Sequence, residues 1–242
     1  QTLVLVDGQR VADPQSGQVD LSLLPTVLLE SVDVLHGAHA ARYGSDGIGG
    51  VVRLHTLQPT TDWRVRTMGR LGAFGAQSAG AVASGGLGRM TALVATEVSR
   101  SERDFPYENE TLFPSQTQRR RGADRTLATV FSKVRYDGPQ HQLGVSGWFN
   151  DVERGLPGVS NAAPSGARQW DTHRRLFADY RTAFGASVLT VDARVQQSAL
   201  RYVNPSTRTQ TSAQTRSYGL SAQLQTLLSP RWSIQSGLDL GS

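Results

Sequence analysis

Four carboxylates lie within nine residues of one polar stretch, and together they could bind a cation. They are Glu102, Asp104, Glu108 and Glu110. Carboxylate oxygens are ligands that Ca²⁺ prefers in proteins, so the stretch predicts calcium bound in a surface loop. The spacing is not that of an EF-hand, and a solvated acidic loop without a metal is the alternative. The sequence indicates no required cofactor.

Other groups of potentially reactive residues favour structural roles. The segment GSDGIGG at 44–50 has the glycines of a phosphate-binding loop, but such loops open a helix, and here a strand pattern follows. Glycines that permit sharp turns are the better interpretation. His36, His39 and His55 lack the spacing of a zinc site and are interpreted as solvated. No Gly-x-Ser-x-Gly elbow occurs, and no catalytic order of Ser, His and Asp is recognisable. We therefore do not expect an enzyme.

Composition narrows the class of protein. The 25 basic and 20 acidic residues give a net charge of +5, spread thinly along the chain apart from the arginines at 119–121. Nucleic-acid binders concentrate their charge, so nucleic acid is not an expected partner. There is no cysteine, which excludes disulfides and thiolate chemistry. No apolar segment approaches the ~20 residues of a membrane helix. The mean hydropathy of −0.33 still permits a membrane barrel, whose strands are apolar on one face only.

Most of the chain alternates apolar and polar residues with a period of two, which is typical of two-faced strands. The run from Val188 to Leu200 is the clearest example. We predict nine such strands, at 61–72, 77–87, 90–100, 124–136, 140–153, 172–184, 187–202, 213–228 and 231–241. Short turns alternate with longer polar connections, apart from a short one near Gly75. This is the pattern of a transmembrane antiparallel β-barrel of the outer membrane.

The apolar faces fit contact with lipid. On the last two strands they are Tyr218, Leu220, Ala222, Leu224, Trp232, Ile234 and Leu238. Tyr136, Phe184 and Trp232 lie beside short turns, where an aromatic girdle is expected. Trp148, Arg175 and Phe177 fall on the inward faces. A soluble β-sandwich also alternates, but its strands are usually shorter than the ~12 residues predicted here.

Residues 1–57 differ from the rest and predict a small α/β unit. Strands are expected at 3–6, 31–35 and 51–56, with an Asp7-Gly8 turn and a short helix from Pro25 to Leu29. We therefore divide the chain into domains 1–57 and 58–242. Both ends of the sequence lie within predicted strands, so we expect a fragment of a longer protein.

Four ordered segments carry a resemblance to a known family. They are VLVDGQRV at 4–11, LSLLP at 21–25, ESVDVLHG at 30–37 and AARYGSDGIGGVV at 40–52. Together, over about residues 3–56, they resemble the second half of the plug domain of TonB-dependent outer-membrane receptors. Ser31 stands where that family usually carries arginine, so the contact normally made there with the barrel wall is expected to differ.

The resemblance implies a 22-stranded barrel enclosing a plug, of which about nine strands are present here. It implies an outer-membrane receptor for uptake of a scarce nutrient chelate, such as cobalamin or a ferric siderophore or haem. The implied energy source is the TonB–ExbB–ExbD complex, acting through an N-terminal segment that this sequence lacks. Outer-membrane lipid and lipopolysaccharide are the other expected partners. A passive porin or adhesin barrel and a soluble β-rich binding module are the alternatives.

Two loop motifs resemble the vitamin B12 (cobalamin) receptor branch of the family, at 105–109 and 154–158. They imply ligand-binding roles for Phe105, Tyr107, Arg154 and Leu156, and calcium in that branch orders the extracellular loops. The plug–barrel contact is assigned to Glu30, Asp33, Gly49 and Gly50. The two carboxylates are expected to pair with inward-facing arginines such as Arg135, Arg181 or Arg194.

Overall fold

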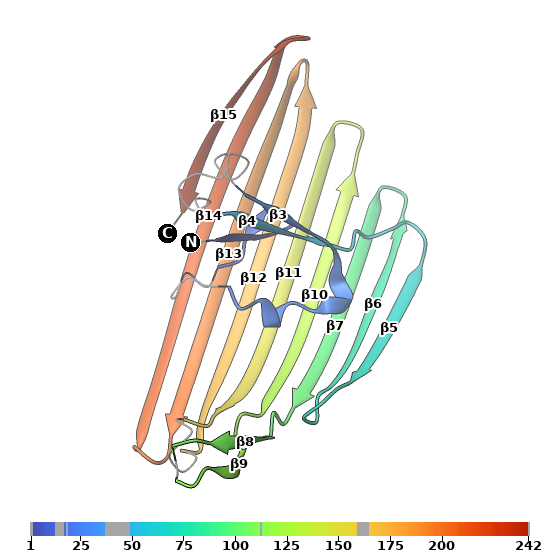
Figure 1. Ribbon diagram of the computed structural model, residues 1–242. Coiled ribbons are helices and arrows are strands. Elements are labelled where there is room, and N and C mark those ends of the chain that lie inside the picture. Colours follow the sequence, from blue (N-terminus) through green and yellow to red (C-terminus); the bar gives the residue numbers. More distant parts are fainter. Residues whose placement is uncertain are drawn as a thin grey trace.

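The computed structural model describes residues 2–12, 17, 19–36, 49–111, 113–158 and 165–241, and its strands form three sheets (Figure 1). The first sheet has the order β2-β1-β4-β3. Its strands are β1 (Leu3–Val6), β2 (Gln9–Arg10), β3 (Leu29–Leu35) and β4 (Val51–Thr56). We call the described residues up to Leu57 the N-terminal unit. The segment 37–48, which includes much of the fourth motif above, lies outside the described residues.

Two single 3-10 turns precede β3, and the second lies within the short helix predicted from Pro25 to Leu29. They are η1 (Leu21–Leu23) and η2 (Thr26–Leu28). Asp20 caps η1 by accepting a hydrogen bond from the Ser22 backbone N–H at 3.0 Å. The short helix predicted from Pro25 to Leu29 is thus present as the 3-10 turn η2, which ends at Leu28 because β3 begins at Leu29.

The second sheet contains all nine predicted barrel strands, each antiparallel to its neighbours, in the order β15-β14-β13-β12-β11-β10-β7-β6-β5. We call this sheet the wall. Its strands are β5 (Arg64–Leu71), β6 (Gln77–Leu87), β7 (Met90–Ser101), β10 (Arg125–Asp137), β11 (His141–Leu156), β12 (Ala167–Phe184), β13 (Ser187–Asn204), β14 (Thr209–Ser229) and β15 (Trp232–Gly241).

The wall has short turns at one end and longer connections at the other (Figure 1). The connection after β7 carries an unpredicted hairpin, formed by β8 (Phe105–Asn109) and β9 (Gln116–Arg120). The connection between β13 and β14 is shorter than predicted. Its Thr- and Ser-rich sequence suits a loop, but Asn204 pairs with Thr209, so both strands extend beyond the predicted ends.

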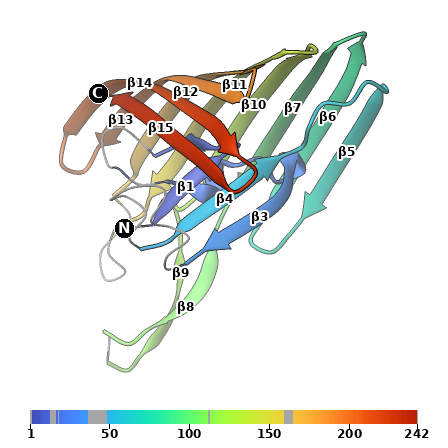
Figure 2. The same ribbon diagram turned by 90° about the horizontal axis from the view of Figure 1, so that it is seen from above.

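The wall curves around the N-terminal unit (Figure 2). Its inward apolar side chains join those of the unit in one core. That core includes Val6, Val27, Leu28, Val82, Leu93, Phe131, Trp148 and Phe177. The inward placement predicted for Trp148 and Phe177 is therefore confirmed.

The outward apolar rows of the wall stay exposed. They include Val94, Val98, Val130, Val134, Leu143, Val145, Leu176, Val195, Tyr218, Leu220, Ile234 and Leu238. A sandwich would bury these rows against a second sheet, and within the described ranges no such sheet covers them. Tyr136, Phe184 and Trp232 are exposed beside the short turns, as expected of an aromatic girdle. Among the described residues, no helix has the length and apolarity to cross a bilayer.

Candidate functional site

The N-terminal unit is attached to the wall through a mostly buried ion pair. Lys133, in the middle of β10, places its Nζ 2.7 Å from Asp7 Oδ2 and donates a hydrogen bond of 2.6 Å to Thr56 Oγ1. Thr56 donates its hydroxyl and its backbone N–H to the same Asp7 carboxylate, at 2.6 and 2.9 Å. The Lys133 side chain is only 7% exposed. Removing one partner of a buried pair typically costs about 3–5 kcal/mol.

Local structure explains why Asp7 can make this contact. Asp7 and Gly8 have φ values of 49° and 84°, which form the tight turn between β1 and β2. Aspartate and glycine tolerate this left-handed backbone better than most residues. The turn leaves the Asp7 carboxylate beside the end of β4, where Thr56 lies. The Asp-Gly pair therefore shapes the turn and also supplies the anion for Lys133.

Two glutamines make further contacts across the same boundary. Gln9 of β2 donates from Nε2 to Asp192 Oδ1 on β13 at 3.0 Å. Gln196, also on β13, donates from Nε2 to the backbone carbonyl of Arg10 at 3.0 Å. The hydrophilic face of β13 thus contacts the N-terminal unit, as the alternation predicted.

A buried network supports η1. Asn150 on β11 donates from Nδ2 to the carbonyl of Leu23 at 3.0 Å and to Thr129 Oγ1 at 2.9 Å. Arg175 donates to Asn150 Oδ1 at 3.1 Å and its guanidinium lies 4.7 Å from the Trp148 ring centroid. A buried amide with partners on both ends fixes the position of the segment it contacts.

Charged groups hold the N-terminal unit at the long-loop end. Arg154 lies 3.9 Å from Asp20 and also pairs with Asp171 on β12. Arg125 donates to the carbonyl of Ser22 at 3.3 Å. Burial alone would raise the pKa of Asp20, but hydrogen bonds from Ser22 and the charges of Arg125 and Arg154 bring that pKa below its ordinary value.

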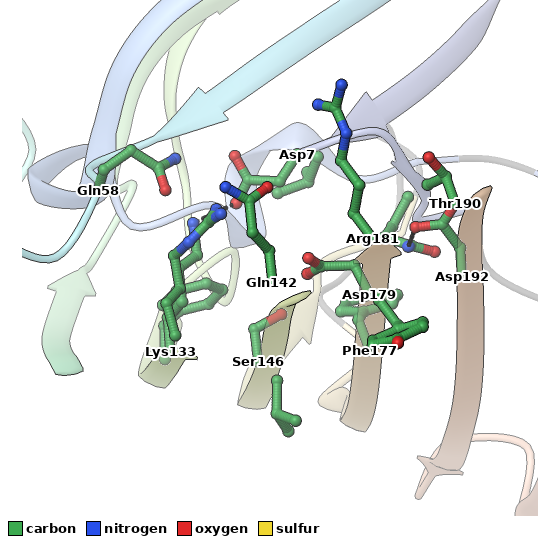
Figure 3. A pocket seen from close by; sticks show the side chains of 16 residues that line it. Asp7, Gln58, Lys133, Gln142, Ser146, Phe177, Asp179, Arg181, Thr190 and Asp192 are labelled. Carbon is green, nitrogen blue, oxygen red and sulfur yellow. Dashed lines mark hydrogen bonds and ion pairs between the residues drawn. The ribbon is translucent and has the colours of Figure 1, made fainter. Parts of the chain in front are cut away.

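A polar cavity of about 260 Å³ lies between the N-terminal unit and the wall, toward the short turns (Figure 3). Its charged lining consists of Asp7, Lys133, Arg135, Asp179, Arg181 and Asp192. Three cations and three anions give the lining no net charge. Figure 3 shows side chains from both parts of the molecule around this space, with Gln58 and Asp7 opposite Gln142 and Ser146. Such a lining suits water or polar groups.

Glu30 and Asp33 were predicted to pair with arginines of the wall, and this prediction is wrong. Asp33 lies 2.7 Å from Arg53 and 3.2 Å from His55, both on the neighbouring strand β4. These hydrogen bonds, Arg53 first, lower the pKa of Asp33. Glu30 is exposed. The reason is topological, because β3 is the edge strand of the first sheet and pairs with β4, which carries Arg53 and His55 beside Asp33.

Gly49 and Gly50 were predicted to contact the wall, but the structure places Gly50 against other strands of the N-terminal unit. Gly50 has a φ of 114°, and its carbonyl accepts from the Leu3 N–H at 3.0 Å. A Cβ at Gly50 would lie 3.1 Å from the Leu35 carbonyl oxygen. The close approach is therefore to the unit's own strands, and Gly49 is exposed.

The predicted ligand residues fall into two groups. Phe105 packs edge-on against Phe74, with centroids 5.8 Å apart, and the Tyr107 hydroxyl donates to Gln118 at 3.0 Å. Both belong to the β8–β9 hairpin. Arg154 and Leu156 lie at the end of β11, where Arg154 contacts Asp20 and Asp171. Their roles in binding a ligand stay predictions.

The predicted calcium ligands are dispersed. Asp104 lies 3.4 Å from Arg119, and Glu108 accepts from Ser115 at 3.1 Å. Glu102 approaches Gly75, and Glu110 is exposed. In the part of the chain that the structure describes, no three metal-binding side chains come together. Calcium binding in this loop stays a prediction.

Lys133, Asn150 and Gln196 are three wall residues whose contacts with the N-terminal unit the sequence analysis did not identify. Each occupies an inward position of a wall strand, flanked by residues such as Phe131 and Trp148 that also face inward. The usable signal was a polar residue with hydrogen-bonding capacity in the middle of an inward face.

The sequence matches a known plug domain. Residues 1–51 match the family described as TonB-dependent Receptor Plug Domain. The vitamin B12 transporter BtuB of Vibrio vulnificus is 45% identical over 56 residues, covering 23% of this chain and 9% of that protein. BtuB of Vibrio cholerae is 35% identical over 100 residues, covering 40% of this chain and 16% of that protein. The matches thus span a small part of these relatives.

The fold matches those of solved receptors. The ferric enterobactin receptor PfeA of Pseudomonas aeruginosa superimposes with a TM-score of 0.78 at 14% identity, over 99% of this chain and 41% of PfeA. The FrpB iron transporter of Neisseria meningitidis gives 0.77 at 14% identity, with the same coverage. At this identity the likeness concerns the fold. Residues 1–51 thus match the plug domain of TonB-dependent receptors, and the chain shares with solved receptors the fold in which a wall of antiparallel strands curves around that domain.

Proposed function

We propose that this chain is part of a receptor that takes up a scarce nutrient, cobalamin first, across the outer membrane. The observation that carries the proposal is a plug held on the inward face of the wall by a small number of polar contacts, with Lys133 and Asp7 at their centre. Such contacts hold the plug in place at rest and can be broken one after another by an applied force.

The nutrient assignment is supported by the relatives. Curated relatives that are 45% identical over 56 residues and 35% identical over 100 residues are named vitamin B12 transporters. In the proposed cycle, the long-loop end binds the nutrient, and the TonB–ExbB–ExbD complex supplies energy from the periplasm. The plug then moves relative to the wall, and the nutrient passes on the side of the polar cavity lined by Lys133 and Asp192.

An anionic iron chelate is the second candidate, because of the charge at the long-loop end. A pocket of about 400 Å³ there is lined by Arg70, Arg100, Arg103 and Arg125 and a single carboxylate, Glu97. A concentration of positive charge raises the local concentration of an anionic ligand. The solved receptors of similar fold include a ferric enterobactin receptor.

Uptake by cells distinguishes the candidates. The full-length receptor is expressed in a strain without its own cobalamin and siderophore receptors, and uptake of radiolabelled cyanocobalamin and of ferric enterobactin is measured. We expect cyanocobalamin uptake that disappears when TonB is deleted. Uptake of ferric enterobactin without uptake of cyanocobalamin would make the iron chelate the proposed nutrient. Uptake of either compound without TonB would contradict an energised receptor.

A further inference from the structure

The lining of the arginine-rich pocket at the long-loop end includes a buried glutamate. Glu97 of β7 lines this space of about 400 Å³ and is only 7% exposed. Its Oε2 atom is buried and has no hydrogen-bond partner among the described residues. Burying a carboxylate oxygen without a donor is costly. A molecule bound in the pocket could supply the hydrogen-bond donor that this oxygen lacks.

The neighbours of Glu97 in the sheet explain why this oxygen lacks a donor. Glu97 pairs with Gly80 on β6 and with Thr129 on β10. Gly80 has no side chain, and the Thr129 hydroxyl accepts from Asn150 at 2.9 Å. A Cβ added at Gly80 would lie 3.4 Å from Val27 Cγ1 and 3.6 Å from Glu97 Cγ. Small and apolar neighbours therefore bury the stem of Glu97, and its carboxylate lines the pocket.

A buried hydrogen-bond donor lines the same pocket. Arg125 of β10 donates from Nη2 to the carbonyl of Ser22 in η1 at 3.3 Å, which fixes its guanidinium against the N-terminal unit. Its Nε is buried and, within the described part of the chain, has no acceptor. The pocket thus offers an acceptor on Glu97 and a donor on Arg125. A primary carboxamide is the complement of these two atoms, because its carbonyl accepts and its NH₂ donates.

Three further arginines in the lining, Arg70, Arg100 and Arg103, make the pocket positive. All three are exposed, in contrast to Glu97. Guanidinium groups bind the anionic oxygens of phosphates and carboxylates. A molecule that complements the whole lining therefore carries an anionic group together with a neutral N–H donor.

We propose that Glu97 is a specificity-determining residue, which accepts a hydrogen bond from a neutral carboxamide of the nutrient while the arginines bind an anionic group of the same molecule. This role rests on the proposed function. Cobalamin has both features, since its ring carries primary carboxamides and its tail carries a phosphodiester. An iron chelate whose outer atoms are anionic acceptors has no donor for Glu97 and is repelled by it. The arginines attract either nutrient, and Glu97 selects between them.

The test measures binding to the purified full-length receptor by isothermal titration calorimetry. The probes are cyanocobalamin, its monocarboxylic acids and ferric enterobactin. In each monocarboxylic acid one carboxamide is hydrolysed to a carboxylate. We expect Glu97→Gln to weaken cyanocobalamin binding ~5- to 10-fold, because a neutral amide oxygen accepts more weakly than a carboxylate. Glu153→Gln is the matched control, because Glu153 pairs with Arg168 on the outward face of the wall. This variant should bind every probe like the unchanged receptor.

The monocarboxylic acids distinguish a contact with the ligand from a loss of packing. The unchanged receptor should bind one of these acids at least ~10-fold more weakly than cyanocobalamin, because a carboxylate of the ligand then faces Glu97. Glu97→Gln should remove most of this difference, because the glutamine side chain can donate to the ligand carboxylate. A merely structural role would weaken binding of cyanocobalamin and of every acid by the same factor, and that result would overturn the proposal.

Ferric enterobactin separates the role of Glu97 from the choice of nutrient. Glu97→Gln removes a like charge, so it should strengthen binding of this anionic chelate ~5-fold or more. If the unchanged receptor binds ferric enterobactin and not cyanocobalamin, the proposed cobalamin function fails, and stronger binding by Glu97→Gln still supports the selection of ligands by Glu97. Equal binding of ferric enterobactin by the variant and the unchanged receptor would overturn that selection. A receptor that binds neither compound would overturn both proposals.

Discussion

Lys133 of the wall and Asp7 of the plug place their charged atoms 2.7 Å apart, and Thr56 is hydrogen-bonded to both residues. The three residues come from different elements, namely a wall strand, a tight turn and the end of a plug strand. Because the lysine is almost fully buried, its charge is balanced mainly by this one carboxylate. The pair therefore couples the position of the plug to that of β10.

Replacing Lys133 by methionine should loosen the plug. The substitution keeps the apolar stem but leaves the half-buried Asp7 carboxylate without its cation, so we expect a loss of about 1–3 kcal/mol in the free energy that holds the plug on the wall. The urea concentration at which the plug of the full-length receptor becomes sensitive to protease measures this loss. In the double variant Lys133→Met/Asp7→Asn the loss should be smaller than the sum of the two single losses. Additive losses would mean that the two residues act independently.

Charge reversal at Glu30 should leave the plug unaffected. Glu30 is exposed on the edge strand β3, and surface substitutions usually change stability by no more than about 0.5 kcal/mol. Glu30→Lys is therefore a matched control for Lys133→Met in the same protease assay. If Glu30→Lys lowered the urea concentration for protease sensitivity as much as Lys133→Met, then Glu30 would contact the wall as the sequence analysis predicted.

The stabilisation of the plug by Asp20 should decrease at low pH. Its pKa in the folded protein lies below the ordinary value of 3.8, so its contribution is fully present above that value and is lost as the pH falls through the folded pKa. Asp20→Asn should make the plug easier to release at pH 7. The difference between Asp20→Asn and the unchanged receptor should begin to shrink as the pH falls below about 4. A difference that grows as the pH falls would exclude an effect of the charge.

Substitution of Asn150 by leucine should destabilise the region around η1. Leucine has a similar size but cannot hydrogen-bond, so the Leu23 carbonyl and Arg175 each lose a partner. Leaving one buried polar group unsatisfied costs about 1–3 kcal/mol. Hydrogen exchange of the amides in residues 20–28 should rise by ~5- to 150-fold. Unchanged exchange there would show that Arg125 and Arg154 alone hold the segment.

The arrangement of strands could be predicted because it depends on a local periodicity. Alternation along runs such as residues 187–202 specifies both the strand and the face that each side chain occupies. The wall strands and the inward placement of Trp148 and Phe177 follow from that pattern. The motifs in residues 4–52 indicated the plug family in the same way, since the order of short segments is a property of the sequence alone.

The contacts between plug and wall could not be predicted, because they depend on how two sheets are placed against each other. Asp33 was assigned to wall arginines, but β3 lies at the edge of the plug sheet, and Arg53 on β4 is closer. Asp7 appeared to be only a turn residue, although its carboxylate contacts Lys133, 126 positions along the chain. Strand periodicity contains no information on such pairs.

Filling the polar cavity should separate nutrient binding from nutrient passage. Ser146 lies on β11 in the lining of this space of about 260 Å³ (Figure 3). A tryptophan at this position would occupy much of it while leaving the long-loop end unchanged. If the nutrient passes between plug and wall on this side, Ser146→Trp should reduce uptake of cyanocobalamin by roughly tenfold or more without a change in binding affinity at the cell surface. Ser132→Trp is the matched control, because Ser132 is on the outward face of the neighbouring strand β10. Equal uptake by the Ser146→Trp receptor and the unchanged receptor would place the passage elsewhere.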